Sequence, residues 1–193
     1  MMSNNIDGID YGPLFQLIGR WSGNKGLDVA PDAAANPDKS AYSDELIVTP
    51  SGPAENAEEQ QLVSVKYHHL VRKKATGRIF HDQIGHWIYE ASTGLIMHSL
   101  TIPRGVCILA GGSIRKDEQG THFEVSANTD NKDFGILQSP FMKSKARTDS
   151  FNMTLTVNEN SLSYVERMWL DIYGKKFEHI DKSLLHKVLY ETE

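Results

Sequence analysis

The chain has 193 residues, of which 39% are hydrophobic and 23% charged, and its net charge is −5. These values are typical of an ordinary globular protein and exclude an intrinsically disordered chain. The acidic excess argues against a nucleic-acid binder, which needs a basic stripe for phosphates, and no apolar run approaches the roughly 18 residues of a membrane span.

The two ends and the cysteine content predict the organisation and the compartment. Residues 1–10 are polar and lack the basic and apolar regions of a secretory signal, so we expect a flexible tail on one domain that spans 1–193. Cys107 is the single cysteine, which fits a reducing compartment and predicts a cytoplasmic protein. Its apolar neighbours indicate a small core residue rather than a nucleophile.

The predicted elements are one short helix followed by strands. The helix covers Tyr11–Ile18, where Pro13 suits a first turn. Polar segments 30–39 and 50–59 are predicted as loops, and 129–145 as a long loop or a short helix. The predicted strands are 21–29, 42–49, 62–72, 79–90, 95–102, 106–114, 121–128, 148–157, 162–173 and 176 to about 190.

Alternation along these strands predicts an all-β fold. In 148–157, Phe151, Met153, Leu155 and Val157 are expected inside, and the residues between them outside. About ten strands joined by consecutive hairpins favour a closed antiparallel up-and-down barrel, because closure removes exposed edges. We expect a calycin-like barrel of the lipocalin and fatty-acid-binding type, with the helix plugging one end and room for a ligand inside. A flat sheet or a sandwich is the alternative.

Glycine and aromatic residues at the start of the barrel carry a resemblance to a known family. The pattern Gly19-x-Trp21-x-Gly23-x-x-Gly26 resembles the opening of the nitrobindin family, haem-binding β-barrels related in shape to fatty-acid-binding proteins. The resemblance continues through 76–85, 92–95, 102–106, 162–164 and 173–179. It implies a ferric haem b held by a histidine early in the last strand and handling of nitric oxide or peroxynitrite.

His179 is the residue that matches this family histidine. The family pattern places Leu directly after the histidine, whereas this chain has Ile180 and then the polar Asp181. A slip of one residue turns a strand side chain to the other face of the sheet. Two interpretations of His179 therefore stand, an inward-facing haem iron ligand and a hydrogen-bonded wall residue near the rim, and His186 is the fallback ligand.

The remaining histidines are sorted by the faces of their strands. His68 and His69 are adjacent and face opposite sides, so they cannot both ligate one metal ion. His81 shares a face with Gln83 and is predicted either to line a cavity or to satisfy neighbouring polar groups. The spacing offers no standard zinc motif.

The stretch 131–145 is the most suggestive segment outside the barrel strands. It holds several apolar residues, including Phe141 and Met142, and is predicted either as a lid over the cavity or as a loop packed on the outside. The candidate cofactor contacts are therefore His179, His81, Phe141 and Met142, with His179 as the metal ligand.

Three functions follow from these observations. The first is haem binding through His179, with peroxynitrite isomerisation if the haem is bound, and the second is a haem-free carrier of a fatty acid or another small hydrophobic ligand. The third uses His81 and Asp82 as an acid–base pair, which is geometrically poor because adjacent strand residues point oppositely. No catalytic signature is present, so we assign no catalytic residue and favour a binding protein. The oligomeric state stays open, with a homodimer as one alternative.

Overall fold

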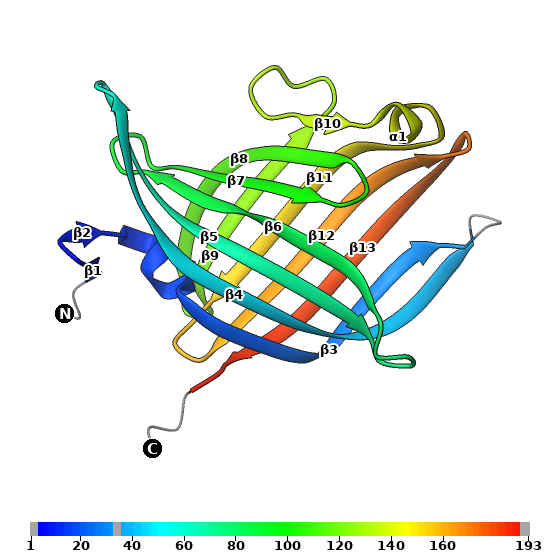
Figure 1. The fold of residues 1–193 in the computed structure, drawn as a ribbon, viewed down its shortest axis with the longest axis horizontal. Coiled ribbons are helices and arrows are strands. Elements are labelled where there is room, and N and C mark those ends of the chain that lie inside the picture. Colours follow the sequence, from blue (N-terminus) through cyan, green and yellow to red (C-terminus); the bar gives the residue numbers. More distant parts are fainter. Residues whose placement is uncertain (1–3, 33–35, 190–193) are drawn as a thin grey trace.

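A computed structural model describes residues 4–32 and 36–189 as a closed barrel of ten antiparallel strands (Figure 1). Each barrel strand pairs with the next one along the chain, and the pairs β13–β3 and β8–β9 close the ring. The predicted up-and-down barrel is confirmed. Its strands are β3 (Gly19–Pro31), β4 (Pro37–Ala57), β5 (Gln60–Lys73), β6 (Ile79–Glu90), β7 (Leu95–Ile102), β8 (Val106–Asp117), β9 (Gly120–Asn128), β11 (Ala146–Val157), β12 (Ser161–Ile172) and β13 (Lys175–Lys187).

The other elements are short. Strands β1 (Asn5–Ile6) and β2 (Ile9–Asp10) form a small hairpin, and its Ile6 and Ile9 pack against the core. The first three residues of the tail expected over 1–10 lie outside the described part of the chain. The segment 129–145 contains β10 (Ile136–Gln138), which pairs with β8 beside the barrel, and the short helix α1 (Pro140–Lys145). No helix among the described residues is long and apolar enough to cross a membrane.

The predicted plug helix is present as η1 (Gly12–Leu17), a 3-10 helix. Its residues Leu14 and Leu17 are buried, and the indole N–H of Trp21 donates to the carbonyl oxygen of Leu17 at 2.8 Å. Because turns alternate between the two ends of an up-and-down barrel, η1 lies at the end opposite to the β5–β6, β7–β8 and β12–β13 turns and to α1, as Figure 1 shows. We name these the plugged end and the α1 end.

Alternation places the core as predicted. Phe151, Met153, Leu155 and Val157 on β11 are buried, and they belong to one hydrophobic cluster that also contains Trp21. The inner face is therefore apolar over much of the barrel, and the polar inner residues described below are confined to particular positions.

Three expectations require correction. The segment 50–59 is not a loop, because β4 runs to Ala57 and β5 begins at Gln60. This hairpin projects beyond the barrel (Figure 1), and its pairing is irregular between Pro50 and Gly52 and between Ala54 and Ala57. The loop predicted over 30–39 is shorter, since β3 extends to Pro31 and β4 begins at Pro37, and residues 33–35 lie outside the described part. Cys107 is exposed on the outer face of β8, so its predicted place in the core is wrong.

Candidate functional site

A polar cluster occupies the inside of the barrel. Its members face inward from six strands, β3, β4, β5, β6, β12 and β13, and several are fully buried although they carry ionisable groups. They are Asp28, Asp44, Tyr67, His69, His81, Gln83, Tyr164, Glu166, His179 and Asp181. Buried charges are costly unless they are paired, so the arrangement of these groups is the first clue to what the barrel binds.

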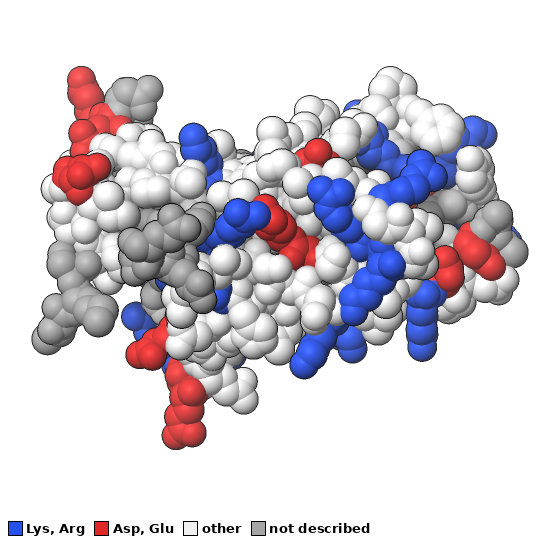
Figure 2. Space-filling view, turned by 60° about the horizontal axis from the view of Figure 1, so that its bottom comes forward, with Lys and Arg blue, Asp and Glu red and all other residues white. Residues whose placement is uncertain are grey.

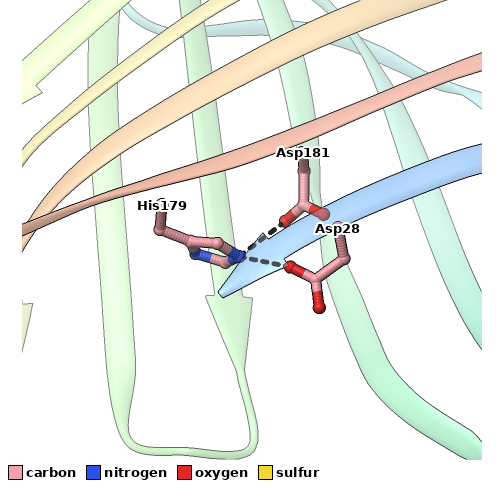
Figure 3. A group of neighbouring side chains, drawn as sticks. All are labelled: Asp28, His179 and Asp181. Carbon is pink, nitrogen blue, oxygen red and sulfur yellow. Dashed lines mark hydrogen bonds and ion pairs between the residues drawn. The ribbon is translucent and has the colours of Figure 1, made fainter. Parts of the chain in front are cut away.

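His179 lies between two carboxylates at one side of this cluster (Figure 3). Its Nε2 is 2.8 Å from Asp28 Oδ1 and 3.2 Å from Asp181 Oδ2. Asp181 stands directly opposite Asp28 in the β13–β3 pair, and His179 precedes Asp181 by two residues on the same face. The side chain of His179 is 19% exposed and that of Asp28 only 9%, so the group is sheltered but reachable from solvent.

The ionisation of this group follows from burial and from mutual charge. Burial by itself lowers the pKa of His179, but the hydrogen bond to Asp28 and the charges of Asp181, Asp28 and Glu166 outweigh it and raise the pKa. Burial raises the pKa of Asp181 to about 6, against the opposing charge of His179. Burial and the charge of Asp181 raise the pKa of Glu166 to about 8. Glu166 therefore keeps its proton at neutral pH, and the surrounding carboxylates favour the protonated form of His179.

Asp44 anchors a second part of the cluster. It accepts hydrogen bonds from the Tyr164 hydroxyl at 3.1 Å and from Ser183 Oγ at 2.9 Å, and it pairs with His69 Nε2 at 3.2 Å. The hydroxyls of Tyr164 and Tyr42 are 2.7 Å apart. Burial raises the pKa of both phenols, so both remain neutral and act as hydrogen-bond donors or acceptors.

A third part leads from His81 to the middle of the barrel. His81 Nε2 is 3.1 Å from Gln83 Oε1, the Gln83 amide donates to the Tyr67 hydroxyl at 2.6 Å, and that hydroxyl bonds His98 Nε2 at 2.8 Å. Burial and the charge of His69 lower the pKa of His81 to about 4, so its imidazole is neutral. The rings of His69 and His81 pack edge to face with their centroids 6.1 Å apart. This contact connects the His81 group to the group around Asp44.

The four candidate cofactor contacts take different places. His179 and His81 both belong to the inner cluster, and the charge of His179 affects the pKa of His81. Met142 is buried in the hydrophobic core, whereas Phe141 is 57% exposed. The fallback ligand His186 lies on the outer face of β13 and is exposed.

The structure separates the residues of the acid–base hypothesis. His81 faces inward, and Asp82 faces outward, where it lies 2.8 Å from His68 Nε2. His68 and His69 face opposite sides as predicted, because His69 bonds the buried Asp44. An acid–base pair of His81 and Asp82 therefore has no geometric support.

Sequence reasoning missed most of the carboxylates. Asp28, Asp44 and Glu166 are buried inside the barrel, and sequence reasoning named none of them as a site residue. For Glu166 a signal was present, because it continues the alternation of Leu162 and Tyr164 on the buried face of β12.

A large hollow lies elsewhere, on the outer surface of the barrel. It measures about 1170 Å³ and follows the outer faces of β4 to β8 beside the segment that precedes β10. Ile47, His68, Ile84, Thr101 and Cys107 stand side by side in register along its floor. Tyr67 of the inner cluster also borders this hollow, whereas His179 and its two aspartates do not.

Comparison with known proteins identifies the family. The family model described as THAP4-like, heme-binding beta-barrel domain matches residues 10–187. The chain belongs to this family. The crystal structure of Rv2717c from M. tuberculosis is similar with a TM-score of 0.66 and 19% identity, over 90% of this chain and 94% of that one, which shows a shared fold. A search of curated proteins finds no match. The predicted resemblance to nitrobindin-like haem-binding barrels is confirmed.

Membership of the THAP4-like family makes haem the ligand to test against the geometry. The inward imidazole of His179 is the right kind of donor, and Met168 stands directly opposite it on β12, with the buried Phe177 preceding it on the same inner face. The Nε2 atom of His179 is shared by Asp28 and Asp181, so both hydrogen bonds would have to be given up if His179 were to hold haem. His179 fits haem by position once those hydrogen bonds are exchanged for iron.

Proposed function

We propose that this protein is a haem-binding barrel in which His179 is the axial ligand of ferric haem. The observation that carries the proposal is the inward orientation of the histidine early in the last strand, within a family described by haem binding. Haem, when bound, would supply the iron chemistry by which such a protein could handle nitric oxide or peroxynitrite.

The residues of the chain control whether His179 is available. An axial ligand must be a neutral imidazole, so the proton that Asp28 and Asp181 favour on His179 has to leave before ligation. The two carboxylates would then need new hydrogen-bond donors, such as water, since neither remains stable when buried without a partner.

Ferric haem titration tests the proposal. Wild type and His186→Ala are expected to give a saturable, shifted Soret band at one haem per chain, because His186 lies outside the barrel. His179→Ala is expected to lose that band while keeping the far-UV circular dichroism of a β-barrel. A folded wild type without the band, or an unchanged band in His179→Ala, would contradict the assignment.

A haem-free carrier is the second candidate. The charges of the inner cluster argue against the fatty acid that the sequence suggested as its ligand. A fatty acid would place its carboxylate among Asp28, Asp44 and Asp181, which disfavours an anion. The same groups favour a polar or cationic small molecule. Mass spectrometry of the extract from purified protein checks this, and a stoichiometric fatty acid would refute the argument from charge.

We further propose a cytoplasmic protein that folds as one domain, as its single cysteine and length suggest. Cell fractionation tests the location.

A further inference from the structure

Three side chains inside the barrel form a compact set of metal-ligating atoms. His179 Nε2, one carboxylate oxygen of Asp28 and one of Asp181 all lie within 4.8 Å of one another. They come from the adjacent strands β3 and β13, and Figure 3 shows the imidazole edge pointing at both carboxylates. From this geometry we propose that Asp28, His179 and Asp181 form a binding site for a divalent transition-metal ion, independent of haem.

The spacing of the three donors suits a single small ion. Ligand atoms about 2.1 Å from a metal lie about 3.0 Å apart in octahedral and about 3.4 Å apart in tetrahedral coordination. The separations of His179 Nε2 from the carboxylate oxygens, 2.8 Å to Asp28 and 3.2 Å to Asp181, are close to these values. The two carboxylate oxygens lie within 4.8 Å of each other, so an ion that replaces the shared hydrogen bonds would draw them together.

The charges inside the barrel also favour a bound cation. Asp28 and Asp181 stand directly opposite each other in register. Like charges placed opposite each other on one face destabilise a sheet. Among the described residues, the ion pairs of Asp28, Asp44 and Asp181 involve only histidines.

The outer surface does not supply the missing positive charge. On the face shown in Figure 2, lysine and arginine side chains spread over the right-hand half of the molecule, toward the α1 end. These cations lie outside, and none makes an ion pair with Asp28 or Asp181 among the residues that the structure describes. A dication would neutralise the two carboxylates where they stand.

The donor set narrows the identity of the ion. Two carboxylates and one imidazole suit Mn²⁺, Fe²⁺ or Zn²⁺, whereas Ca²⁺ prefers oxygen ligands only and Cu⁺ prefers sulfur. Three protein ligands leave coordination positions for water or a small molecule, as in open metal sites. The partial exposure of His179 and Asp181 gives such a molecule access.

Manganese binding tests the site, using the full chain treated with chelator and without added haem. We expect electron paramagnetic resonance of Mn²⁺ to show one bound ion per wild-type chain. Asp28→Asn and Asp181→Asn keep the side-chain shapes and remove the charges, so each should weaken binding at least tenfold. Glu178→Gln is the matched control, because Glu178 lies on the outer face of the same strand and pairs with Arg167.

The outcomes separate the two proposals. Loss of Mn²⁺ binding in both aspartate variants with retention in Glu178→Gln supports the metal site, whatever the haem titration shows. Absence of binding in wild type, or equal binding in the aspartate variants, overturns it. If Asp28→Asn does not fold, Asp181→Asn decides alone, and circular dichroism identifies which case applies.

Discussion

His98 is the residue whose replacement tests the energetics of the barrel interior most directly. It is 1% exposed, its ring stacks on Trp87 at 4.1 Å between centroids, and its Nε2 bonds the Tyr67 hydroxyl. Among the described residues, its Nδ1 has no hydrogen-bond partner. Burial, with a smaller contribution from His69, lowers its pKa to about 3. We predict that His98→Phe changes the pH dependence of stability.

The sign follows from proton binding. Between pH 6.5 and 3 the unfolded chain binds a proton at residue 98 that the folded chain does not, so wild type loses stability as the pH falls. The loss approaches about 1.4 kcal/mol per pH unit well below pH 6.5 and amounts to about 2 kcal/mol between pH 6.5 and 4.5. Near pH 7 the free energy of unfolding of His98→Phe should be only about 1 kcal/mol below that of wild type, because the hydrogen bond to Tyr67 is lost. At pH 4.5 the variant should therefore be the more stable protein.

Urea denaturation followed by far-UV circular dichroism, at several pH values from 4.5 to 7, measures this difference. Comparison with wild type cancels the opposing contributions of Glu166 and Asp181, whose raised pKa values favour folding at lower pH. Tyr67→Phe is the control, because it removes the same hydrogen bond and keeps the imidazole, so it should retain the wild-type slope. Parallel curves for wild type and His98→Phe would refute a neutral, buried His98.

Two further predictions concern packing and exposure. Gly26→Ala should destabilise the fold by about 1–3 kcal/mol, since a Cβ there would lie 2.0 Å from the ring of Tyr42, and an unchanged urea midpoint would count against this close approach. Cys107 should react fully with a thiol reagent in the native state, because it is exposed on β8, and a thiol that reacts only after denaturation would restore the core prediction.

The barrel was predictable because its strands alternate and its turns are short. On β11 every second residue from Phe151 to Val157 is buried, and such a period assigns both the element and its inner face. The prediction that Cys107 lies in the core was wrong for a related reason. Its neighbours on both sides are apolar, so the period does not say which set faces inward, and the outer hollow explains why apolar residues such as Leu109 remain outside.

The site was predictable only in part. The family resemblance pointed to His179, which the structure places in the inner cluster, but its contact with Asp28 was not foreseen. Asp28 is 151 residues away, and its position opposite Asp181 is decided by the register in which the last strand closes on the first. A polar residue in an alternating strand is expected to face water, and a barrel that binds a polar group inside reverses that rule.

Haem and a divalent ion require the same atom of this chain. Both proposals use Nε2 of His179, so one molecule cannot hold both ligands there, and replacing the histidine removes both. The carboxylates act in opposite senses. They are ligands for a small ion, whereas for haem they are competitors that hold a proton on the imidazole. Neutralising Asp28 should therefore weaken Mn²⁺ binding and leave haem binding intact or tighter, so the response of one residue to two ligands shows which of them the interior is built to hold.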